Sequence, residues 1–166
     1  GAPIAYILKA RTTLLRDMGQ AMSPFNAWMF IQGLETLPLR MREHCRNAET
    51  VARHLAAHPA VSRVIFPGLE KDAAIRAQGE KTMPGGWGGL VGFELTGGGA
   101  SGAKFIDALK LFYHVANIGD VRSLAIHPWS TTHQQLSDEE KIAAGVTEGY
   151  VRLSVGIEHI DDIIAD

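Results

Sequence analysis

The feature that most constrains the fold is a long stretch of helical spacing in the first half of the sequence. Small or apolar residues recur there at steps of three or four, namely Leu37, Met41, Cys45, Ala48, Ala52 and Leu55. This spacing places them on one face of a single helix and predicts that this face packs on a core. His58 and Pro59 follow, and proline predicts the end of the helix because it cannot continue the hydrogen-bond ladder.

Two shorter helices are expected before this one. Residues 5–18 carry helical spacing, and Gly19 suits a C-terminal stop. Ser23 followed by Pro24 is typical of a helix start, with serine as the N-cap and proline at the first helical position. This helix is expected to run to about Thr36, where the nearby Pro38 restarts or kinks it.

After the long helix, short apolar runs alternate with helical segments. Strands are predicted over 61–66, 90–95, 123–126 and 151–155, with a glycine turn at 97–99. Helices are predicted over 71–79, over 103–111 and after the capping box at 137–140. This order predicts an α/β fold, a two-layer sandwich in which helices cover one side of a small sheet. Residues 160–166 are typical of a helix start with no stop signal, which predicts truncation in the last helix.

Composition excludes several classes of function. The chain has 166 residues, which is the length of one domain, and a formal net charge of −2, which disfavours a nucleic-acid partner. Charged residues interrupt every apolar run before it reaches membrane-spanning length, and no signal peptide is recognised. The single cysteine, Cys45, has no internal disulfide partner, which fits a reducing compartment such as the cytoplasm.

The usual signatures of chemistry are weak in this sequence. The glycine-rich segments at 85–89 and 97–99 match neither a dinucleotide fingerprint nor a P-loop, so we interpret them as turns. His127 and His133 lie six residues apart around a proline, a spacing that favours a hydrogen-bonded structural role over a metal site. Cys45 lies on the apolar helix face and behaves as a small hydrophobe.

Arg152 leaves two readings open. It alternates with Val151, Leu153 and Val155 in the last predicted strand, so its side chain lies on the face opposite these apolar residues. Most arginines in such a position are simply solvated. The alternative is a rigidly held guanidinium fork that binds a carboxylate.

Several motifs together resemble a known family. The segments are 23–27 (SPFNA), 33–41 (GLETLPLRM), 117–136 (NIGDVRSLAIHPWSTTHQQL) and 150–158 (YVRLSVGIE). In this order they resemble the linking helices and C-terminal domain of the Cys/Met-metabolism family of pyridoxal-phosphate (PLP) enzymes, which are type I PLP-dependent transferases. Residues 117–120, 130–136 and 156–162 resemble its O-acetylhomoserine sulfhydrylase branch, although Trp129 departs from that pattern.

The resemblance implies a division of the chain and two site residues. Residues 1–22 would be a linker helix from a missing large PLP domain, and residues 23–166 the C-terminal domain that binds the substrate carboxylate. Arg152 matches the arginine that binds the α-carboxylate, and Asn117 matches a position that orients the same group. The Schiff-base lysine and the cofactor's other contacts belong to the large domain. We therefore expect no catalytic, cofactor-binding or metal-binding residue in this chain.

The resemblance also implies a reaction for the full-length enzyme. It would convert O-acetyl-L-homoserine plus sulfide or methanethiol to homocysteine or methionine plus acetate, with PLP as cofactor, as a cytoplasmic homotetramer. The chain alone is expected to be inactive and not to bind PLP. Alternatives are a cystathionine γ-synthase or a methionine γ-lyase of the same family. A non-catalytic α/β interaction module is an alternative of a different class.

Overall fold

The computed structural model describes residues 3–166, which form two compact units, one ending at Leu37 and the other spanning Pro38–Asp166. Within the described residues, no helix combines the length and the apolar character needed to cross a bilayer.

The first unit is helical, as predicted. Helix α1 (Ala5–Lys9), the π-helical turns η1 (Ala10–Leu15) and α2 (Arg16–Met18) follow one another without a break. They end at Gly19, whose φ of +66° is the left-handed conformation that glycine adopts without strain. Helix α3 (Pro24–Glu35) begins where expected, because the Ser23 hydroxyl accepts a hydrogen bond from the Asn26 amide at 3.1 Å.

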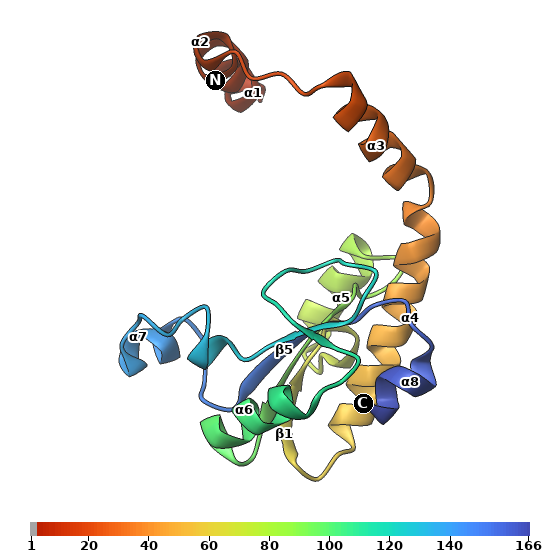
Figure 1. The fold of residues 1–166 in the computed structure, drawn as a ribbon, viewed down its shortest axis with the longest axis vertical. Helices are drawn as coiled ribbons and strands as arrows, with labels where there is room; N and C mark the ends of the chain where they lie inside the picture. Colours follow the sequence, from red (N-terminus) through yellow and green to blue (C-terminus); the bar gives the residue numbers. More distant parts are fainter. Residues whose placement is uncertain (1–2) are drawn as a thin grey trace. The chain divides into compact units, whose positions relative to one another are not determined.

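The second unit contains a five-stranded mixed sheet with the order β1-β2-β5-β4-β3. Its strands are β1 (Val61–Ile65), β2 (Leu90–Leu95), β3 (Tyr113–His114), β4 (Leu124–Ile126) and β5 (Tyr150–Ser154). All neighbouring strands are antiparallel except β3 and β4. Its helical elements are α4 (Leu37–Ala56, starting at the unit boundary), η2 (Pro67–Leu69), α5 (Ala73–Thr82), α6 (Gly98–Ala108), η3 (Pro128–Ser130), α7 (Asp138–Ala143) and α8 (Ile160–Ala165), and Figure 1 shows their order.

One face of the sheet forms the core. Val151, Leu153 and Val155 are buried, and Val151 and Leu153 pair with Phe93 and Val91 of β2, so all of these side chains share a face. Helices α4, α6 and α8 contribute buried residues to the same cluster. The predicted α/β fold with helices packed on one side of a small sheet is confirmed. Arg152 and Ser154, at alternate positions of β5, belong to the opposite face.

The predicted face of α4 is partly wrong. Leu37 and Met41 are 37% and 40% exposed, whereas His44 and Asn47 are buried next to Ala48, Val51 and Ala52. The reason is that His44 and Asn47 bond backbone carbonyls beyond β5, so this part of the helix turns polar side chains inward. A pattern of apolar residues does not reveal such partners.

The glycine turn predicted at 97–99 is also wrong in part. Helix α6 begins at Gly98 rather than near Ala103, and Gly98 has a φ of +64°. A Cβ on Gly102 would lie 2.5 Å from His127 Nε2, so glycine lets the helix approach this ring closely. The two-residue strand β3 was not predicted, since it is too short to show a period.

Candidate carboxylate-binding site

Arg152 lies in the middle of β5, on the face of the sheet that does not carry the core. Its register partners are Gly92 on β2 and Ile126 on β4, so the backbone on both sides is fixed. The absence of a Cβ on Gly92 leaves room on this face, which the ring of Tyr150 uses. A side chain on a central strand is held more precisely than one on a loop.

The Arg152 guanidinium contacts the loop of residues 115–123, drawn in teal in Figure 1, which connects β3 to β4. Its Nη2 donates to the carbonyl oxygen of Ala116 at 2.6 Å and lies 3.5 Å from that of Asn117. Its Nε is shielded from solvent and has no hydrogen-bond partner among the described residues. Both hydrogen bonds use Nη2 alone, so the other terminal nitrogen of the cationic fork can donate to an anionic ligand.

Arg152 and the 115–123 loop line an open pocket of about 550 Å³. It is lined by Ala116, Asn117, Ile118, Gly119, Asp120 and Arg152. The structure therefore brings together the two residues that the sequence predicted, Arg152 and Asn117. A cationic fork beside an exposed amide side chain suits a small carboxylate that carries further polar groups.

Three contacts hold the 115–123 loop on the end of β5. The Ser154 hydroxyl accepts from the Gly119 amide at 3.0 Å, and the Ile157 amide donates to the Val121 carbonyl at 2.9 Å. The Glu158 carboxylate accepts from the Ser123 amide at 2.6 Å and from its hydroxyl at 2.9 Å. The pocket wall is thus tied to the strand that carries Arg152.

Helix α4 supports the same region from the core side. His44 Nδ1 lies 2.7 Å from the Val155 carbonyl, and Asn47 Nδ2 donates to the carbonyls of Gly156 and Glu158 at 3.1 and 3.0 Å. Sequence reasoning missed these supporting residues. For Ser154, the only signal in the sequence was its spacing of two residues from Arg152. The other supporting residues gave no signal, because their contacts join residues more than 30 positions apart.

The electrostatics of this face are simple. Tyr150 follows the same alternation as Arg152, and burial raises the pKa of its hydroxyl above the ordinary value, while the Arg152 charge acts in the opposite direction. The Asp120 carboxylate accepts from the Arg122 amide at 3.0 Å, which shapes the loop. Arg152 is the cationic side chain among the residues that line the pocket, so it is the group there that can bind an anion.

The other candidates have structural partners. His127 is 2% exposed, and its ring nitrogens lie 2.9 Å from Ser130 Oγ and 2.7 Å from the Glu148 carbonyl, which confirms the predicted hydrogen-bonded role. Trp129 carries the Lys141 ammonium 4.3 Å from its ring centroid. The described part of the chain holds no group of three or more metal-ligating side chains.

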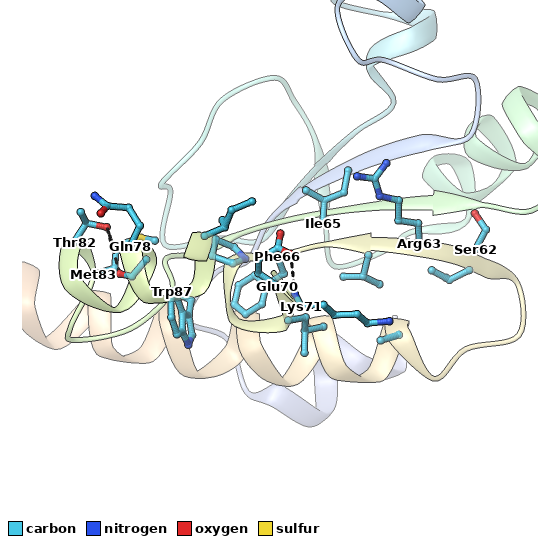
Figure 2. A pocket seen from close by; sticks show the side chains of 17 residues that line it. Ser62, Arg63, Ile65, Phe66, Glu70, Lys71, Gln78, Thr82, Met83 and Trp87 are labelled. Carbon is cyan, nitrogen blue, oxygen red and sulfur yellow. Dashed lines mark hydrogen bonds between the residues drawn. The ribbon is translucent and has the colours of Figure 1, made fainter. Parts of the chain in front are cut away.

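A second, larger groove of about 770 Å³ runs along the edge strand β1 and helix α5. Figure 2 shows Arg63 and Ile65 projecting from β1 and Trp87 lying beside helix α5. Most of its lining is apolar, and Lys71 and Arg63 are its cationic side chains. This groove lacks the convergent polar groups that orient a small ligand.

The Arg152 pocket lacks the groups that would hold a PLP cofactor. None of the six lysines lines it, and its only cationic side chain is Arg152. It has no helix N-terminus or glycine-rich cradle for a phosphate among its lining residues. The residues that line this pocket therefore fit a carboxylate and not the cofactor.

Comparisons with known proteins show which sequences and structures this chain resembles. The chain is 56% identical over 166 residues to the O-acetyl-L-homoserine sulfhydrylase of Leptospira meyeri, covering 100% of this chain and 38% of that protein. It is 54% identical over 167 residues to the enzyme of the same name from Corynebacterium glutamicum, again with 100% and 38% coverage. The chain therefore spans about 38% of the length of these curated relatives.

A solved structure shares the fold. It is a putative O-acetylhomoserine (thiol)-lyase from Campylobacter jejuni that carries N'-pyridoxyl-lysine-5'-monophosphate, with a TM-score of 0.82 and 40% identity over 99% of this chain and 39% of that one. The family model described as "Cys/Met metabolism PLP-dependent enzyme" matches residues 5–166. The chain belongs to the Cys/Met-metabolism family of PLP-dependent enzymes.

Proposed function

We propose that this chain is the C-terminal part of an enzyme that replaces the acetate of O-acetyl-L-homoserine with sulfide or methanethiol. The products are homocysteine or methionine, together with acetate. Within this proposal, residues 1–22 link to the large PLP domain and residues 23–166 bind the substrate carboxylate. The support is the membership of the family, the names of the relatives and one geometric observation.

That observation is the pairing of Arg152 with Asn117 in one pocket. A guanidinium held on a central strand matches the planar shape of a carboxylate. The Asn117 amide lies on the loop that Arg152 touches, where it would bond the same carboxylate or the neighbouring amino group. Together they would hold Cα of the amino acid at a fixed distance from the sheet.

The proposed task of this chain is orientation. PLP, when bound in the full-length enzyme, supplies an electron sink for bond cleavage next to the substrate Cα. Arg152 and Asn117 would fix the carboxylate so that the substrate cannot rotate while its bonds change. Holding a reactant in the productive geometry contributes a large part of a catalysed rate.

The full-length enzyme is proposed to be a cytoplasmic homotetramer. The single cysteine, Cys45, fits a reducing compartment. The apolar side chains exposed on α3 favour burial against other protein surfaces in the assembled enzyme. We propose that this chain by itself neither turns over substrate nor binds PLP specifically.

Kinetics on the full-length enzyme test the proposal. O-acetylhomoserine, O-succinylhomoserine and methionine are offered in turn, with sulfide or methanethiol as acceptor where one is needed. We expect the highest kcat/KM with O-acetylhomoserine. A preference for O-succinylhomoserine would indicate a cystathionine γ-synthase, and a preference for methionine a methionine γ-lyase. No turnover of any of these substrates would favour the non-catalytic interaction module.

A further inference from the structure

The 115–123 loop carries Asn117, one of the two residues of the proposed carboxylate site. Strand β5, which the loop contacts, carries the other, Arg152. Arg152 and Ser154 are two positions apart on β5 and therefore project from the same face. The first reaches the loop at Ala116 and the second reaches it at Gly119. Asn117 lies between these two attachment points.

We propose that Ser154 is a positioning residue for this carboxylate site, an inference that rests on the proposed function. Its hydroxyl accepts the Gly119 amide at 3.0 Å, and its side chain is almost completely buried. Water therefore cannot easily replace a lost hydroxyl. The bond fixes the loop two residues after Asn117 without any contact between Ser154 and the substrate.

Gly119 needs such an anchor. Its φ of +79° lies in the left-handed region, so the chain turns sharply at this residue. A glycine also has the widest choice of backbone conformations once its hydrogen bond is lost. Ser154 thus selects one conformation at the residue that decides where the loop places Asn117.

Apart from Arg152, the other tethers lie at the end of the loop that leads into β4. The Val121 carbonyl accepts from the Ile157 amide at 2.9 Å, and Ser123 bonds Glu158. Without the Ser154 hydroxyl, residues 117–120 would be held by Arg152 on one side and by Val121 on the other. We expect the loop to remain attached but Asn117 to lose its fixed position.

This role predicts a defect that depends on the carboxylate. Loss of one neutral hydrogen bond corresponds to roughly a 2- to 12-fold effect on affinity. The effect should fall on ligands that carry an α-carboxylate and should spare otherwise identical amides. A general structural defect would weaken both kinds of ligand equally.

The experiment uses the full-length enzyme and two competitive inhibitors, L-norvaline and L-norvalinamide, which differ only in the carboxyl group. Ser154→Ala removes the acceptor, and Ser154→Cys keeps a side chain of similar size but a much weaker acceptor. Both variants should weaken norvaline binding by about 2- to 12-fold and leave norvalinamide binding within about 2-fold. KM for O-acetylhomoserine should rise more than kcat falls.

Two comparisons make the result decisive. Ser62→Ala, which removes a strand hydroxyl bonded to the Glu94 carbonyl away from the pocket, should leave the inhibitor ratio unchanged. Arg152→Ala should abolish the preference for norvaline. If Arg152→Ala abolishes this preference while Ser154→Cys keeps it in full, the positioning role of Ser154 is wrong and the proposed carboxylate site stands. If Arg152→Ala keeps the preference too, the carboxylate site itself is wrong.

Discussion

Replacing Arg152 with alanine in the full-length enzyme should greatly lower kcat/KM and change the stability of the fold only slightly. If the guanidinium binds the substrate carboxylate, its removal leaves that charge without its partner, which typically costs about 2–5 kcal/mol. At about 1.4 kcal/mol per factor of ten, kcat/KM should fall roughly 30- to 4000-fold. Arg152→Lys should recover only part of this loss, because the charge returns but the planar fork does not.

The structure adds a smaller effect on stability. Arg152 Nη2 donates to the Ala116 carbonyl at 2.6 Å, and alanine cannot replace this contact. Because the contact is partly exposed, we expect its loss to lower the free energy of unfolding by about 1 kcal/mol. The full-length enzyme is longer than the chains of 150–250 residues for which this loss corresponds to roughly 2–4 °C, so its Tm should fall by less than that.

Steady-state kinetics, the visible spectrum of the bound cofactor and thermal melting form the assay. The cofactor spectrum should stay normal, because no cofactor contact is assigned to this chain. Arg63→Ala, which removes an exposed arginine from the edge strand β1, is the matched control and should keep kcat/KM within about 2-fold, as for most surface substitutions. Near-normal kcat/KM in Arg152→Ala would refute the assignment of the carboxylate to this residue.

Three further predictions concern the chain itself. Mixed with PLP and treated with borohydride, it should show no stoichiometric adduct on one particular lysine, and a single labelled lysine by mass spectrometry would contradict this. The chain should also self-associate, because the apolar side chains of Phe25, Trp28 and Met29 are 65%, 55% and 55% exposed. Light scattering should therefore reveal oligomers, and the double substitution Trp28→Gln with Met29→Gln should reduce their amount. Gly102→Ala should lower Tm, because the added Cβ would lie 2.5 Å from His127 Nε2, whereas Gly85→Ala meets open space and should have a much smaller effect; equal shifts would refute the packing argument.

Local signals in the sequence predicted the elements that depend on local physics. Ser23, Gly19 and the box from Ser137 to Glu140 mark helix ends in the structure where they were predicted, because capping involves residues only a few positions apart. The alternation around Arg152 likewise predicted the burial of Val151, Leu153 and Val155, but not that of Ser154 on the opposite face. The start of α6 was missed because Gly98, Gly99 and Gly102 disfavour a helix in isolation, and only tertiary packing makes them useful there.

The site was predictable only in part. Arg152 and Asn117 came from the resemblance, since an arginine on a strand has no distinctive local pattern. The supporting contacts of Ser154 and Glu158 join residues 35 positions apart, and those of Asn47 join residues 109 and 111 apart. Such pairs follow from the strand order and the packing of α4, which no short motif encodes.

The alternation of β5 has a consequence for how the protein tolerates change during evolution. Val151, Leu153 and Val155 serve the core while Arg152 and Ser154 serve the pocket, so inserting or deleting one residue would exchange the two sets of side chains. Folding and ligand recognition would then fail together. The exposed residues of the 115–123 loop are under no such double constraint, because Asn117, Ile118 and Asp120 contribute nothing to the core. New ligand preferences should therefore arise in this loop, while β5 stays almost unchanged.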